Sequence, residues 1–214
     1  RIEIPSTSWS LLPDSDIAMV RLNSFSQRSA DELQETLREA QDAGAQALIF
    51  DLRNNPGGLV NEAIGVASQF LPNGTPVLIE ENRTGERQTT ETHGGGVALD
   101  IPVVVLVNEH TASAAEIVSG AMQAADRAHV VGIPTVGTGT VLTPFQLKDG
   151  AQLLLGTSQW LTPDGRLIRK QGITPDTEVA LPPETMIVSP NDVEELSRDE
   201  LQETQDDQLL QAIE

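Results

Sequence analysis

The sequence predicts an α/β domain with a mixed, mainly parallel sheet and flanking helices, and three observations support this fold class. First, strand-like apolar runs alternate with segments of helical periodicity along most of the chain, which is typical of parallel sheets covered by helices. Second, residues 45–52 and 101–108 are continuous apolar runs, as expected for strands buried on both faces. Third, each of these runs ends in a turn-forming or polar loop, and sites in such folds lie at the carboxyl ends of the strands.

The first half of the chain contains three predicted strands and two predicted helices. Ser29 and Glu32 have the spacing of a capping box, and Gly44 follows the last turn, so a helix is expected over 29–44. The second helix is expected over 59–74, ended by Pro72 and Gly74. The strands are expected at residues 18–25, 45–52 and 75–80, and the polar, glycine-rich residues 82–100 indicate a mobile loop or a short hairpin.

The second half begins with the apolar strand 101–108, followed by a helix that starts at Ser113. The apolar positions of this helix recur at helical spacing as far as Ala125. A short strand is expected over 128–132, and residues 140–147 and 151–161 form a predicted antiparallel hairpin around the turn "KDG". The chain then reads as irregular as far as Pro183, and a short amphipathic helix is expected near 206–214.

Composition excludes several classes of function. The net charge is −19, and the tail from Glu184 to Glu214 alone holds ten carboxylates and one arginine, which argues against nucleic acid and anionic membranes as partners. No apolar run approaches the roughly 18 residues of a membrane span. The chain has no cysteine, two lysines and three histidines, so any mechanism that needs lysine or histidine has five candidates. No cluster of metal-ligand spacing and no nucleotide-binding glycine motif is present, so neither a metal nor a cofactor is expected.

Two loops contain the candidate site residues. Ser113 and Glu116 form a capping box, and the pattern alone favours a helix cap over a nucleophile. A serine at a helix N-terminus also faces unpaired amides and a positive dipole end, which favour a developing negative charge, so Ser113 could be a nucleophile as well as a cap. The amide of Ala114 is one candidate oxyanion donor. The turn "RNNPGG" exposes further amides, and either Gly57 or Gly58 could supply the second donor.

Three segments carry a resemblance to a known family. "LIFDLRNNPGGLVNEAIGVASQFL", "LDIPVVVLVNEHTASAAEIVSGAMQ" and "GITPDTEV" look like the carboxyl-terminal processing peptidases, a family of serine proteases, and stand in the family's order. The resemblance covers about residues 17–181. It implies a spiral core of the ClpP/crotonase type, Ser113 as nucleophile, Glu116 as a supporting residue, and a protein or peptide substrate cleaved near its C-terminus.

At two positions the sequence differs from the pattern of the family that it resembles. In that family a lysine base lies 25 residues after the serine in a Gly-Lys-Gly turn, with a glutamine four residues further on; here these positions hold Thr138 and Leu142. A threonine cannot serve as a base near neutral pH. His110, three residues before Ser113, is the candidate replacement, although an ordinary loop role is favoured for it. His93, His129, Lys148 and Lys170 are weaker candidates, and Asp51 and Arg53 are expected to have solvated or structural roles.

The domain expectation has three parts: a segment 1–16 that looks like the exit from a PDZ domain, a protease-like core over 17–183, and an acidic tail over 184–214. The resemblance implies a periplasmic or cell-envelope location, and a homo-oligomer is left open. Two alternatives to a peptidase remain: a catalytically impaired scaffold that binds peptides or ligands, and, from fold analogy alone, a crotonase-like acyl-CoA enzyme.

Overall fold

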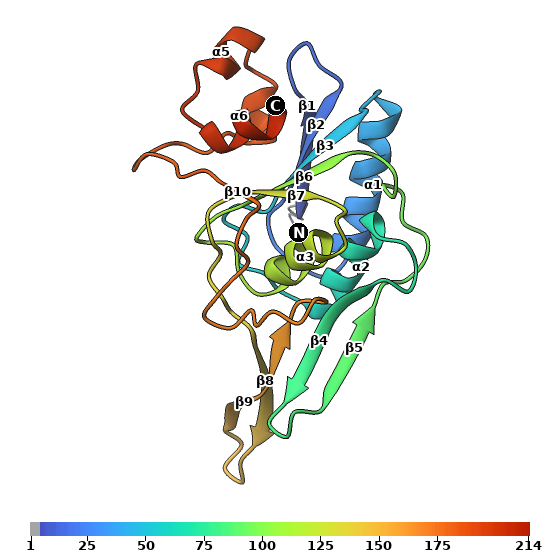
Figure 1. The fold of residues 1–214 in the computed structure, drawn as a ribbon, viewed down its shortest axis with the longest axis vertical. Helices are drawn as coiled ribbons and strands as arrows, with labels where there is room; N and C mark the ends of the chain where they lie inside the picture. The colour runs from blue at the N-terminus through green and yellow to red at the C-terminus, as the bar shows by residue number, and fades with distance from the viewer. Residues whose placement is uncertain (1–4) are drawn as a thin grey trace.

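The computed structural model describes residues 5–214, and within them the strands form two sheets (Figure 1). The larger sheet has six strands in the order β1-β2-β3-β6-β7-β10. Strand β1 pairs antiparallel to β2, and all the other neighbours in this sheet run parallel. The predicted fold class, α/β with a mixed, mainly parallel sheet and flanking helices, is confirmed.

The predicted elements are present with boundaries that differ by a few residues. The N-terminal half contains β1 (Thr7–Leu11), β2 (Ile17–Leu22), α1 (Ser29–Asp42), β3 (Ala47–Asp51), α2 (Val60–Phe70), β4 (Pro76–Asn82) and β5 (Arg87–Glu91). The C-terminal half contains β6 (Val103–Val107), α3 (Ala114–Ala124), β7 (His129–Gly132), β8 (Thr140–Gln146), β9 (Gln152–Leu161), β10 (Thr177–Glu178), α4 (Pro190–Val193), α5 (Arg198–Gln202) and α6 (Asp207–Ile213).

The larger sheet is buried on both faces, as its apolar strands predict. On one face, Val20, Phe50 and Val105 pack in a core that is shared with α1, α2 and α3. The alternate residues of the same strands, such as Met19 and Ile49, face a second core that is completed by apolar residues of the C-terminal segment. Apolar residues of the segment 184–214 therefore pack on this face of the sheet, and Figure 1 shows α5 and α6 on that side.

The smaller sheet has the order β5-β4-β9-β8 and extends away from the core as two hairpins, seen at the lower end of Figure 1. The β8–β9 hairpin is confirmed around its predicted turn. Of the two alternatives expected for residues 82–100, the hairpin forms, because β5 pairs antiparallel with β4. Strand β8 starts directly after the loop that contains Thr138, so this sheet borders the candidate site.

The start of α1 corrects the expected capping box. Arg28, with φ 72°, occupies the N-cap, and Ser29 already belongs to the helix. Glu62 of α2 accepts hydrogen bonds from the Arg28 and Ala30 amides at 3.2 and 2.9 Å, and it accepts from the Ser29 hydroxyl as well. Glu32 instead binds the amide and hydroxyl of Ser6. The physical reason is that the Glu62 carboxylate, which comes from the neighbouring helix α2, satisfies the free amides at the start of α1. The Glu32 carboxylate is therefore available to bind Ser6.

Part of the expected segment 1–16, residues 1–4, lies outside the described residues. The remainder contains β1, which joins the edge of the larger sheet beside β2. No helix in residues 5–214 combines the length and the apolar character needed to cross a bilayer.

Candidate functional site

Ser113 lies between the end of β6 and the first turn of α3, in an uncommon backbone conformation. Its φ and ψ are 54° and −116°, which a residue with a side chain rarely adopts and which costs about 1–3 kcal/mol. The preceding loop is tied to the loop after β3, because the Thr111 hydroxyl donates to Leu52 O at 2.9 Å and the Ala112 amide donates to Asn55 O at 2.9 Å. These contacts hold Ser113 at the positive end of the helix.

The "PGG" turn packs directly against Ser113. A Cβ atom on Gly57 would lie 2.7 Å from Ser113 Cβ and 2.8 Å from the Ala114 nitrogen, and Gly57 also has a φ of 91°. Only glycine fits this contact, because a side chain would overlap the serine and the conformation is left-handed. Two loops that are more than 50 residues apart in sequence are thus brought into van der Waals contact.

The amides around Ser113 differ in their availability. The Gly57 amide donates to the Asn55 side-chain oxygen at 2.8 Å, and Asn55 is itself buried. Among residues 5–214, in contrast, no hydrogen-bond acceptor is present for the Gly58 amide or for the Ala114 amide. These two amides, one in the loop after β3 and one at the first residue of α3, are therefore free to donate a hydrogen bond.

Glu116 connects the serine to the loop after β7. Its fully buried carboxylate accepts from the Ser113 amide at 2.8 Å, which provides one arm of the predicted capping box. It also accepts from the amides of Gly137 and Thr138 and from the Thr135 hydroxyl, at 2.6, 2.8 and 2.5 Å. Four donors satisfy this buried charge, and they hold residues 135–138 beside the start of α3.

Thr138 therefore lies close to Ser113, whereas Leu142 faces solvent. The amides of Thr138 and Ser113 bind the same Glu116 oxygen, each at 2.8 Å, so the two nitrogens are less than about 6 Å apart. The Thr138 side chain is exposed, and Leu142 in β8 is 58% exposed. A side chain at position 138 therefore starts near the backbone of Ser113, and a threonine hydroxyl is not a base near neutral pH.

In the described residues 5–214, none of the histidine and lysine candidates forms a hydrogen bond with the Ser113 side chain. His110 has a 70% exposed side chain, and its Nε2 lies 3.8 Å from a carboxylate oxygen of Glu109. His93 is exposed on the loop after β5, and His129 pairs with Thr177 at 2.7 Å. Lys148 is exposed in the β8–β9 turn. Within residues 5–214, no histidine, lysine or carboxylate side chain forms a hydrogen bond with the Ser113 hydroxyl.

Lys170 is the lysine whose backbone lies nearest to the Thr138 loop. Its amide donates to the Gly137 carbonyl at 2.9 Å, and its side chain is exposed. Across residues 5–214, no group of three or more histidine, aspartate or glutamate side chains is placed to hold a metal ion.

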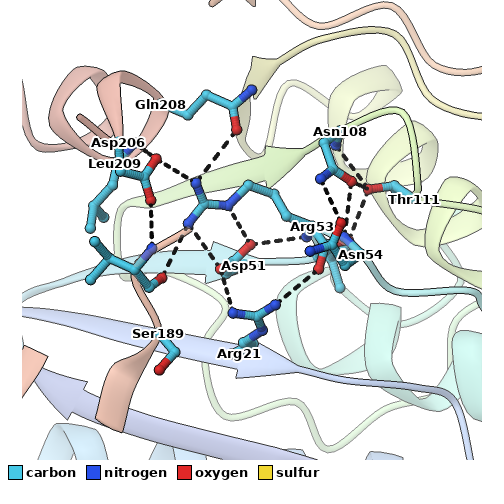
Figure 2. Close-up of polar contacts among 12 residues, drawn as sticks. Arg21, Asp51, Arg53, Asn54, Asn108, Thr111, Ser189, Asp206, Gln208 and Leu209 are labelled. Atoms are coloured by element: carbon cyan, nitrogen blue, oxygen red, sulfur yellow. Dashed lines mark hydrogen bonds and ion pairs between the residues drawn. The ribbon is translucent and has the colours of Figure 1, made fainter. Parts of the chain in front are cut away.

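The loop after β3 is anchored by a buried ion network, shown in Figure 2. The Arg53 guanidinium binds Asp51 through Nε at 2.9 Å and Nη2 at 3.1 Å, and it binds Asp206 through Nη1 at 2.6 Å. All three side chains are fully buried. Burial opposes the charged form of Arg53, yet the adjacent Asp51 and Asp206 carboxylates outweigh it and raise the pKa of the guanidinium above its ordinary value.

Sequence reasoning missed the residues that support the loops. The pair Asn54 and Asn108 joins the two site loops through hydrogen bonds of 2.8 and 2.9 Å, as Figure 2 shows, and Thr111 holds the second loop. Asparagine and threonine side chains in turns often form hydrogen bonds with the backbone. Their presence in these two turns was the signal in the sequence that could have identified the supporting residues. The role of Asp206, 153 residues from Arg53, had no local signal.

Comparison of the sequence with known proteins identifies the family of this chain. The profile of peptidase family S41 matches residues 16–179. The carboxyl-terminal-processing protease of Synechocystis sp. is 40% identical over 170 residues, which are 79% of this chain and 39% of the relative. The carboxy-terminal processing protease CtpA of Bacillus subtilis is 36% identical over 176 residues, 82% of this chain and 38% of the relative. The chain thus spans about two fifths of the length of these relatives.

A solved structure shares the fold. The photosystem II D1 C-terminal processing protease superposes with a TM-score of 0.80 and 28% identity, over 90% of this chain and 52% of that one. The chain belongs to peptidase family S41, among the carboxyl-terminal processing peptidases.

Proposed function

We propose that this chain is the core of a serine endopeptidase that cleaves protein or peptide substrates near their C-termini. The observation that carries the proposal is the placement of Ser113 between two unpaired amides, those of Ala114 and Gly58. Ser113 Oγ attacks the scissile carbonyl, and the two amides stabilise the negative charge that develops on its oxygen. Gly57 lets the turn approach the serine, while Glu116 positions the serine and the Thr138 loop.

The choice of Gly58 over Gly57 as second donor follows from their partners. The Gly57 amide is bound to Asn55, and its carbonyl accepts from the Phe25 amide at 2.9 Å. A donor that already has a buried partner gains little from a transition-state oxygen, whereas a free amide gains a full charge-assisted hydrogen bond. We therefore assign Gly58 and Ala114 to the oxyanion hole.

The general base is the incomplete part of this mechanism. His110 remains the replacement that the sequence suggested, but its exposed side chain must rotate toward Ser113 to act. An oxyanion hole without a base still accelerates acyl transfer by about 10³–10⁴ over water. We therefore expect slow turnover. If His110→Ala leaves a measured rate unchanged, the histidine assignment is wrong.

The proposal is tested by labelling with a fluorophosphonate probe. Wild type is expected to label slowly over hours, and Ser113→Ala is expected not to label, because the probe reacts with an activated serine hydroxyl. Ser119→Ala serves as a control, since Ser119 lies in α3 with its hydroxyl bound to Ala115 O. Failure of wild type to label, together with unchanged peptide binding by Ser113→Ala, would contradict the peptidase proposal.

One observation favours a second function, peptide binding without hydrolysis. Thr138 and Leu142 occupy the positions of the family's base and its orienting partner, and neither can perform that role. The labelling experiment separates the two functions. In either case we propose a protein or peptide partner and, from the family, a periplasmic or cell-envelope location.

A further inference from the structure

The loop after β3 contains a fully buried asparagine, Asn55, whose side chain forms hydrogen bonds with two different segments. Its Nδ2 donates to the Leu22 carbonyl, at the end of β2, at 2.7 Å. Its Oδ1 accepts from the Gly57 amide at 2.8 Å. Asparagine supplies one donor and one acceptor at this short reach, whereas an ionised aspartate has acceptors alone. The carboxamide therefore links a strand of the larger sheet to the turn that contacts Ser113.

The main chain of Asn55 binds the other side of the same contact. Its carbonyl accepts from the Ala112 amide, directly before Ser113, at 2.9 Å. A Cβ atom on Gly57 would lie 2.7 Å from Ser113 Cβ, which places Gly57 Cα within about 4.2 Å of that atom. Asn55 thus holds both partners of the contact, the turn through its side chain and the serine loop through its carbonyl.

The segment after β2 binds other polar groups of the turn. The Phe25 amide donates to the Gly57 carbonyl at 2.9 Å, and the Leu59 amide donates to the Phe25 carbonyl at 2.8 Å. A Cβ atom on Gly58 would lie 2.3 Å from Phe25 O, so only glycine fits there. Of the three amides at positions 57–59, two have acceptors within residues 5–214, and the third, that of Gly58, has none.

We propose that Asn55 is a positioning residue of the oxyanion hole, which fixes the turn so that the Gly58 amide is free to donate to the substrate's carbonyl oxygen. The inference rests on the proposed function and adds to it the residue that sets the geometry of one donor. Asn55 acts through the turn, because its side chain is fully buried. A transition-state oxygen needs a donor held at about 2.7–3.1 Å, so a loosened turn weakens this hydrogen bond without removing the donor.

Hydrogen exchange of backbone amides in the full chain, followed by two-dimensional NMR, tests the arrangement of the turn. In wild type we expect the Gly57 amide to be at least about tenfold more protected than the Gly58 amide, because only the first has a buried acceptor. Asn55→Ala should raise the exchange rate of the Gly57 amide by about tenfold or more. Equal protection of the two amides in wild type, or an unchanged Gly57 rate in Asn55→Ala, would overturn the proposal.

The kinetics of fluorophosphonate labelling test the role in the reaction. Varying the probe concentration separates the maximal rate of labelling from the concentration that gives half of it. Asn55→Ala is expected to lower the maximal rate by about tenfold to a hundredfold and to change the half-saturating concentration by less than about twofold. The reason is that negative charge develops on the phosphoryl oxygen only as its bond to Ser113 forms. An unchanged maximal rate would refute the positioning role.

Ser68→Ala is the matched control for the loss of a buried polar side chain. Ser68 lies in α2, is buried, and donates its hydroxyl to the Ile64 carbonyl at 2.7 Å. We expect this variant to label with the constants of wild type. An equal fall in the maximal rate for Ser68→Ala and Asn55→Ala would show general destabilisation and would also refute the positioning role.

Failure of this inference is distinguishable from failure of the proposed function. If wild type and Asn55→Ala label at the same maximal rate, the peptidase proposal stands and Asn55 loses its role. If wild type does not label, the peptidase proposal fails, and the exchange of the Gly57 amide still decides whether Asn55 holds the turn.

Discussion

Replacing Asp206 by alanine tests whether the C-terminal segment holds the site loop in place. The Asp206 carboxylate binds the buried Arg53 guanidinium, caps α6 through the Leu209 amide at 3.1 Å, and accepts from the Val188 amide at 3.0 Å. Removing one partner of a buried ion pair costs about 3–5 kcal/mol, because the other charge stays buried without compensation. Loss of the helix cap, about 1 kcal/mol by itself, acts in the same direction.

Equilibrium urea unfolding of wild type and Asp206→Ala measures this effect as a change in the free energy of unfolding. Asp207→Ala is the matched control, because Asp207 is the next residue, is exposed and lies outside the network; we expect it to cost less than about 1 kcal/mol. Because Arg53 immediately precedes the loop 54–58, Asp206→Ala should also slow the labelling of Ser113. A loss for Asp206→Ala no larger than that for Asp207→Ala would refute the reasoning.

Three further predictions concern the site and its supports. Thr138→Lys with Leu142→Gln should raise casein hydrolysis by about 10²–10⁴, the usual contribution of a general base; no gain would show that the pocket differs in more than these two residues. Gly57→Ala should lower the free energy of unfolding in urea by about 1–3 kcal/mol more than Gly85→Ala, because both have positive φ but only Gly57 contacts the serine; equal losses would argue against that contact. The Ser6 hydroxyl, opposed by burial, lowers the pKa of Glu32, so this carboxylate stabilises the fold above its unfolded-state pKa of about 4.3. That stability is lost as the pH falls through the lower folded pKa, so the stability gap between wild type and Glu32→Gln should close between pH 6 and pH 3; a constant gap would contradict it.

The strands and helices were predictable because their signals are local. The apolar runs around β3 and β6, the helical periodicity after Ser113, and the turn between β8 and β9 depend on neighbouring residues. The capping box expected at Ser29 was wrong because the deciding contact is not local. Glu62, which lies in α2, binds the free amides at the start of α1. A pattern within one segment cannot show which distant side chain will satisfy its amides.

The position of Ser113 at the start of a helix, the family resemblance, and the expectation that Thr138 stands where the family has a lysine all come from the sequence alone. The tertiary structure decided which amides remain free, since the side chain of Asn55 occupies the Gly57 amide and leaves that of Gly58. It also decided that Arg53 pairs with Asp206, and that Asn54 bonds to Asn108 across the two site loops. Periodicity and spacing encode local conformation, whereas these contacts arise only when packing of the sheet brings distant loops together.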